Sequence, residues 1–86
     1  MDAVALRVRL DEGPVLADGG MGTALIDAGV PVATCMEALN ERAPARVAAI
    51  HSAFVAAGAR LVLTNTFGAN RFRLEHHGLA DRVVEV

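Results

Sequence analysis

Apolar and polar positions along the chain predict an alternation of helices and short buried strands. Residues 3–11 alternate like a strand but also line one face of a helix, and we favour a helix that a Gly-Pro pair ends. The short apolar run at Val15 predicts a buried strand over about 15–18, and a similar run predicts a second strand over about 61–65. Both strands are apolar on both faces, as expected for strands covered on each side.

The clearest helical pattern begins at Pro44, because proline fits the first turn of a helix, where its missing N–H costs nothing. Four apolar residues and one histidine then fall on one face of the helix, which predicts that this face is buried. These residues are Val47, Ile50, His51, Phe54 and Val55. Gly58 should end this helix.

Three shorter helices are also expected. One should span residues 24–28, with Thr23 as its cap, and end at a glycine. Another should span residues 71–77, with Asn70 as its cap, and also end at a glycine. An amphipathic helix should begin near Leu79. The two glycines that end helices here are Gly29 and Gly78.

This order, strand, helices, strand, helix, is typical of parallel strands covered by helices, so we expect an α/β fold. Two parallel strands do not make a stable sheet alone, because both outer edges stay open. The pattern therefore suggests part of a larger domain. A complete 86-residue domain is the alternative.

Composition narrows the classes of function. Apolar residues make up 53% of the chain, which excludes disorder by composition, but only Phe54, Phe67 and Phe72 are aromatic. The net charge of −2 argues against nucleic acid and anionic membranes as partners. Cys35 is the single cysteine and no secretory signal is visible, so we expect a soluble, cytoplasmic protein.

Candidate chemistry lies at the ends of the two predicted strands. Asp18 is followed by Gly19 and Gly20, whose N–H groups can hold a carboxylate while the Asp18 carboxylate attracts an ammonium group. The alternatives are a tight turn with Asp18 as a cap, or a phosphate site at the glycines. Asn65 and Thr66 follow the second strand and either line the same site or satisfy hydrogen bonds of the turn.

The sequence contains no recognisable metal-binding or nucleotide-binding motif. The glycines do not follow the dinucleotide-binding spacing, and no lysine completes a phosphate-binding loop. His76 and His77 are neighbours, so in a helix they point in different directions and would not share an ion. Cys35 has no paired base, which favours a small packed thiol.

Several segments, read together, resemble homocysteine S-methyltransferases. They are DGGMGT (18–23), LN (39–40), AIH (49–51), AAGA (56–59), TNTFGANR (64–71) and GLADRV (78–83). The first and the fifth at this separation are highly specific, and the likeness runs from Val15 to Val86. One departure is the segment from Leu39 to Val47, where relatives more often carry Leu-Asn-Leu-Thr.

The resemblance implies a (β/α)8 TIM barrel, a fold that typically needs ~250 residues. Residues 1–86 would then be the N-terminal portion of a homocysteine-binding domain, truncated at the C-terminus and containing about the first two βα units. The other reading is a non-catalytic truncated α/β fragment.

The resemblance also implies a reaction: zinc held by three cysteines binds the homocysteine thiolate, which attacks an activated methyl group to give methionine. Cys35 does not match a zinc-ligand motif, so we expect the zinc ligands to lie downstream. We expect no catalytic residue within these 86 residues, and the chain alone should be inactive. Asp18 would bind the substrate ammonium, Gly19 and Gly20 its carboxylate, and Asn65 and Thr66 would line the pocket. The methyl donor, whether betaine, S-methylmethionine or methyl-folate, stays open.

Overall fold

The computed structural model describes residues 2–86, and its regular elements are helices. In chain order they are α1 (Ala3–Asp11), α2 (Met21–Asp27), the 3₁₀ turn η1 (Met36–Ala38), α3 (Leu39–Arg42), α4 (Pro44–Ala56), α5 (Arg71–Glu75) and the 3₁₀ turn η2 (Ala80–Arg82). None of the helices within residues 2–86 is long and apolar enough to cross a membrane.

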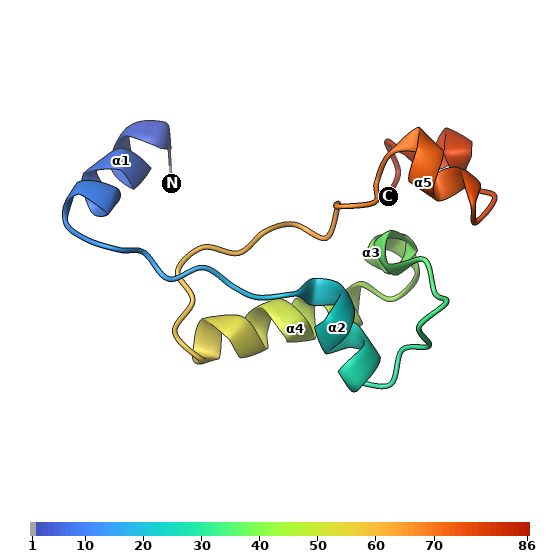
Figure 1. Cartoon of the computed structure of the whole chain (residues 1–86), viewed down its shortest axis with the longest axis horizontal. Coiled ribbons are helices and arrows are strands. Elements are labelled where there is room, and N and C mark those ends of the chain that lie inside the picture. Colours follow the sequence, from blue (N-terminus) through green and yellow to red (C-terminus); the bar gives the residue numbers. More distant parts are fainter. Residues whose placement is uncertain (1) are drawn as a thin grey trace.

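Helix α1 confirms the helical interpretation of residues 3–11. The Asp2 side chain caps it by accepting the Ala5 N–H at 2.8 Å. The helix buries none of its residues and stands apart at one end of the molecule (Figure 1). It is therefore held mainly by its own cap and turns.

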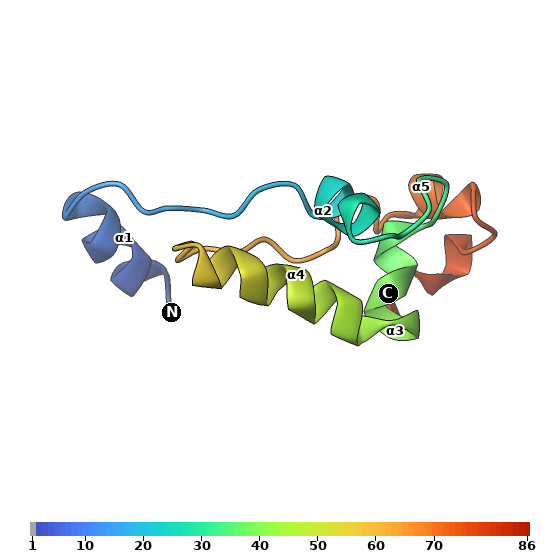
Figure 2. The same ribbon diagram turned by 90° about the horizontal axis from the view of Figure 1, so that it is seen from below.

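Helix α4 confirms the clearest prediction. It begins at Pro44, and Gly58 follows its end with a φ of 115°, a left-handed conformation that only glycine adopts without strain. Its predicted face is buried at Val47, whereas Val55 is 48% exposed and lies off the packed side. Helix α4 packs against α2 and lies roughly along the long axis in the middle part of the molecule (Figure 2).

The shorter helices depart in detail from their predictions. Helix α2 starts at Met21, and its cap residue is Gly20, so Thr23 lies inside the first turn and caps nothing. Asn70 does cap α5, accepting the Arg73 N–H at 3.0 Å, but that helix ends at Glu75. In place of the amphipathic helix expected near Leu79, the chain forms the short turn η2.

The two predicted strands are extended segments that pair at one point. Ala17 and Leu61 form a single parallel bridge, in which the Asp18 N–H donates to the Leu61 carbonyl at 2.9 Å. In a longer parallel ladder the next N–H, that of Leu63, would donate to the Asp18 backbone carbonyl. It donates instead to the Asp18 side chain at 3.2 Å, so the ladder ends after one bridge.

The expected α/β fold, the opening βα units of a (β/α)8 barrel, is therefore wrong for this structure. Helix accounts for 52% of the residues and strand for 2%, and no sheet forms among residues 2–86. The physical reason is that two short segments can form backbone hydrogen bonds only along the edge that they share. The N–H and C=O groups on both outer edges stay unpaired, so a two-stranded sheet is not stable. The parallel direction of the pair is the part of that expectation that the structure retains.

The molecule is elongated, with extents of 45 × 26 × 17 Å. Its radius of gyration of 14.8 Å exceeds the ~12 Å of a compact domain of this length. One core cluster joins Cys35, Ala38 and Leu74, with Leu79 and Val86 packed against it. This cluster packs η1, which supplies one of the segments of the candidate site, against α5.

Candidate functional site

A pocket of about 330 Å³ lies where the two extended segments leave their single bridge. Three stretches line it, residues 18–22, residues 36–37 and residues 63–67. The first belongs to the glycine turn and the start of α2, the second to the start of η1, and the third to the turn before α5. Segments far apart in the sequence thus converge on one cavity.

All five residues that the sequence singles out line this pocket. They are Asp18, Gly19, Gly20, Asn65 and Thr66. The pairing of the two extended segments brings their polar ends side by side, as the sequence pattern suggested, although no sheet is formed. What each residue binds stays a prediction.

Asp18 is half-buried and links the two extended segments through both its backbone and its side chain. Its N–H donates to the Leu61 carbonyl at 2.9 Å, and its Oδ2 accepts the Leu63 N–H at 3.2 Å. Because Gly20 occupies the cap position of α2, Asp18 is not the cap of that helix. The carboxylate is therefore held at the edge of the pocket by the opposite segment.

Gly19 and Gly20 present backbone to the pocket. Their N–H groups donate to no acceptor within residues 2–86, so they are available to an anionic group. A Cβ on Gly19 would lie 3.1 Å from Cε1 of Phe54, whereas one on Gly20 would lie 3.6 Å from Oγ1 of Thr23. Gly19 thus sits tightly against the α4 aromatic ring, and Gly20 has room.

Asn65 is buried, with 7% of its surface exposed, and its side-chain amide is engaged. Nδ2 donates to the Met36 carbonyl at 2.8 Å and to Oδ1 of Asn40 at 3.0 Å. These partners lie on η1 and α3 rather than in the turn of Asn65, so its side chain joins the turn to those elements while lining the pocket. Thr66 is exposed, and its hydroxyl shares a 2.8 Å hydrogen bond with that of Thr64.

Sequence reasoning missed two residues that support the side of the pocket formed by residues 63–67. Glu37 lines the pocket, and its Oε2 accepts the Gly68 N–H at 3.2 Å. Asn40 lies outside the lining but donates to the Asn65 carbonyl at 2.8 Å. Asn40 belongs to the LN segment (39–40) of the family resemblance, and this membership could have identified it as a candidate. Nothing in the local sequence pattern indicates a role for Glu37.

The charge of the pocket is negative. Its lining carries the carboxylates of Asp18 and Glu37, and none of the described residues that line it is Arg, Lys or His. This arrangement suits a ligand with a cationic group beside a carboxylate that the glycine N–H groups can hold. A phosphate, with no cation to meet it and two carboxylates nearby, fits poorly.

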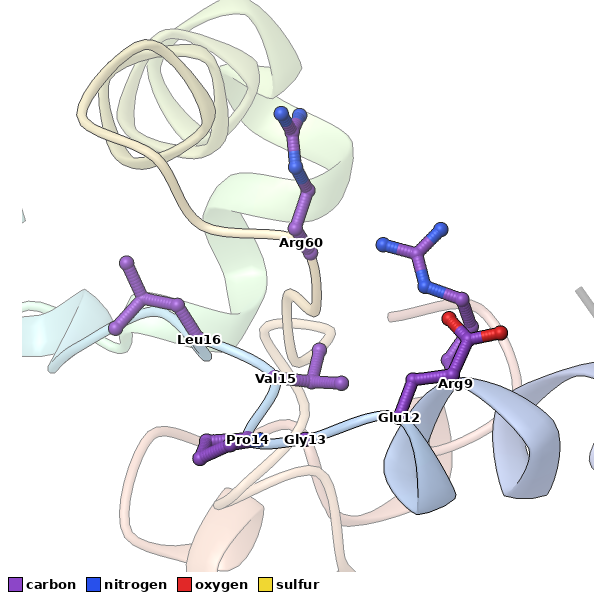
Figure 3. A pocket seen from close by; sticks show the side chains of 7 residues that line it. All are labelled: Arg9, Glu12, Gly13, Pro14, Val15, Leu16 and Arg60. Carbon is purple, nitrogen blue, oxygen red and sulfur yellow. The ribbon is translucent and has the colours of Figure 1, made fainter.

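A second cavity, of about 350 Å³, lies near the C-terminal end of α1. Arg9 comes to it from α1, Glu12 from the position directly after α1, and Arg60 from the position just before the second extended segment (Figure 3). All three residues are exposed, and none of the residues singled out by the sequence reaches it. The candidate site is therefore the pocket beside Asp18.

The described residues do not fit a zinc ion. Within residues 2–86 no three His, Cys, Asp or Glu side chains come together in a group that could hold a metal. Cys35 is buried in the core cluster, and His76 and His77 are exposed.

Comparison with known proteins adds independent findings. The sequence model of one family, described as homocysteine S-methyltransferase, matches residues 15–86. A methionine synthase of Mycobacterium leprae (strain TN) is 40% identical over 75 residues, which cover 80% of this chain and 6% of that protein. A methionine synthase of Mycobacterium tuberculosis (strain ATCC 25618 / H37Rv) is 38% identical over 80 residues, or 86% of this chain and 7% of that protein. The chain thus spans a small part of the length of these relatives. No solved structure matches.

Proposed function

Because this chain belongs to the homocysteine S-methyltransferase family, we propose that it contributes a homocysteine pocket to an enzyme that methylates the homocysteine thiol to give methionine. The proposed binding unit is residues 15–86, the part that the family model matches. The family membership supports methyl transfer as the chemistry, and the pocket beside Asp18 supports the amino-acid substrate.

The observation that carries the proposal is that the Asp18 carboxylate lies in the same pocket as the unpaired N–H groups of Gly19 and Gly20. Homocysteine carries an ammonium and a carboxylate on one carbon, so it needs a negative and a positive partner close together. In the proposal the Asp18 carboxylate binds the ammonium, and the N–H groups of Gly19 and Gly20 bind the carboxylate. The thiol then extends away from this headgroup site.

Asn65 and Thr66 form the opposite wall in this proposal. The Asn65 side chain is largely occupied by η1 and α3, so its part is to shape the wall. The exposed Thr66 hydroxyl, already paired with Thr64, is the more available of the two for a ligand. Neither residue is assigned a chemical step.

Zinc belongs to the chemistry that the family resemblance implies, where it would make the homocysteine sulfur a thiolate. Since residues 2–86 hold no group of side chains suited to the metal, we assign no residue of this chain to zinc and derive no step through it. The proposal for these residues is limited to binding and orienting the amino-acid headgroup. A cytoplasmic location is part of the proposal, because a reducing compartment keeps the substrate thiol free.

The test is binding of L-homocysteine to the purified chain, followed through the backbone amide signals of Gly19 and Gly20. We expect saturable shifts of both signals. The compound 4-mercaptobutyrate, which lacks only the ammonium group, should bind at least about tenfold more weakly. Equal binding of the two compounds, or saturation by inorganic phosphate instead, would overturn the proposal.

A further inference from the structure

We propose that Asn40 and Glu37 are positioning residues of this pocket, which hold the turn of residues 65–68 as its second wall. The inference rests on the proposed function, because the pocket they would shape is the proposed homocysteine site. Neither residue was singled out by its local sequence. Both lie on the η1–α3 stretch, and both reach the same turn.

Asn40 holds the start of the turn with a reciprocal pair of hydrogen bonds. Its Nδ2 donates to the Asn65 backbone carbonyl at 2.8 Å, and its Oδ1 accepts Nδ2 of Asn65 at 3.0 Å. The same Nδ2 also donates to the Val86 carbonyl at 3.0 Å. Every polar atom of the Asn40 amide is thus engaged, and the pairing fixes both the backbone and the side chain of the buried Asn65.

Glu37 holds the end of the turn. Its Oε2 accepts the Gly68 N–H at 3.2 Å, and Gly68 is buried against the carboxylate. A Cβ on Gly68 would lie 2.8 Å from Oε1 of Glu37, so the carboxylate would have to shift from its present position to make room for a larger residue. The two ends of the turn are therefore anchored to the same short stretch of chain.

Packing does not hold the centre of this turn. Phe67, at its centre, is 92% exposed, and Thr66 is exposed as well. The hydrogen bond that Gly68 donates to Glu37, the bond from Asn40 to the Asn65 carbonyl and the bond from Asn65 to the Met36 carbonyl tie its two ends to the rest of the molecule. Since residues 63–67 line the pocket opposite the glycine turn, loss of these bonds would let one wall move away from a ligand bound at Asp18.

A competing role for Glu37 is direct contact between its carboxylate and the substrate ammonium. The two roles differ in what they need from the side chain. Positioning needs an oxygen that accepts the Gly68 N–H, which the carbonyl of glutamine also supplies. A direct ionic role needs the negative charge, which glutamine lacks.

The experiment measures L-homocysteine affinity in the full chain, with circular dichroism confirming the fold of each variant. Glu37→Ala should weaken binding by about tenfold, and Glu37→Gln should stay within about threefold of the unchanged chain. Asn40→Asp, which removes both donated hydrogen bonds, should also weaken binding by about tenfold. The matched controls, Glu75→Ala and Asn70→Asp, lie on or beside α5 outside the pocket lining and should leave affinity unchanged.

A ligand-free readout accompanies the titration and keeps the inference testable in variants of low stability. The Gly68 amide should exchange faster with solvent in Glu37→Ala and recover its protection in Glu37→Gln. Equal losses of affinity in the alanine and glutamine variants would overturn the positioning role of Glu37. Unchanged affinity in Asn40→Asp and Glu37→Ala would overturn the inference while leaving the proposed function intact. Absence of homocysteine binding by the unchanged chain would overturn both.

Discussion

The side chain of Asp18 takes the place of a backbone carbonyl opposite Leu63. Its Oδ2 accepts the Leu63 N–H at 3.2 Å, at the position where the next bond of a parallel ladder would form. The residue that the proposed function assigns to the substrate ammonium is therefore also the residue that ends the pairing of the two extended segments. These two roles depend on different properties, an acceptor oxygen and a negative charge, so they can be separated.

Asp18→Asn keeps the size of the side chain and an oxygen that can accept the Leu63 N–H, but removes the charge. We expect the fold to survive and L-homocysteine affinity to fall by about tenfold or more, because a partly buried ion pair is lost. Titration calorimetry would measure the affinity. Asp27→Asn, an exposed position in the last turn of α2, is the matched control. Unaltered affinity in a folded Asp18→Asn chain would reduce Asp18 to a structural residue of the turn.

Two neighbouring glycines should respond differently to alanine. In Gly19→Ala the new methyl group would lie 3.1 Å from Cε1 of Phe54, so the ring must move by a few tenths of an ångström and its packing against the glycine turn is strained. Gly20→Ala meets Thr23 at an ordinary distance of 3.6 Å, at a φ of −67° that alanine adopts readily. Thermal unfolding should show a clear loss of stability for Gly19→Ala and little change for Gly20→Ala. The reverse order would contradict the close contact between Gly19 and Phe54.

Leu74 should be the apolar side chain of α5 that matters most for stability. It is fully buried in the cluster with Cys35 and Ala38. Leu74→Ala leaves a cavity there and should lower the free energy of unfolding by on the order of 2–4 kcal/mol. Leu10→Ala, at a position of α1 that is 51% exposed, should change it by under ~0.5 kcal/mol. Urea denaturation of both variants would compare them, and similar losses would contradict the assignment of the core.

The chain should bind no stoichiometric zinc and transfer no methyl group to homocysteine on its own. It carries the single cysteine Cys35, which is buried, whereas thiolate zinc sites need several ligands. Metal analysis of protein purified in the presence of zinc is the measurement. Equimolar zinc that survives dialysis would show that the ligands lie within these 86 residues after all.

Self-association or low stability is expected at high protein concentration. The extended segments leave backbone groups unpaired, and Leu63, Phe67 and Phe72 are 76%, 92% and 77% exposed. Sedimentation velocity over a range of concentrations should show species larger than the monomer. A monomer that unfolds cooperatively with several kcal/mol of stability would instead indicate a self-sufficient domain.

Local rules explain which elements were predictable. The start of α4 at Pro44 and its stop at Gly58 follow from the geometry of proline and glycine alone, as does the cap of α5 by Asn70. The sequence predicts the start of α2 three residues late, because threonine is a common helix cap, whereas the chain uses Gly20 without a side-chain hydrogen bond. The prediction of two strands is wrong because a β-ladder needs neighbouring strands as partners, and the periodicity of one segment does not show whether such partners are present.

Sequence alone determined the family and predicted, through the segments that carry the resemblance, that Asp18, the glycines after it and the Asn65 turn share one site. The structure places these residues in the lining of one pocket. Tertiary structure alone decided how the site is held. The bond from Asn40 to Asn65 spans 25 residues and that from Gly68 to Glu37 spans 31, separations over which no helical or strand period relates two positions. Such contacts exist only once the chain has folded back on itself, and they depend on the direction of single side chains.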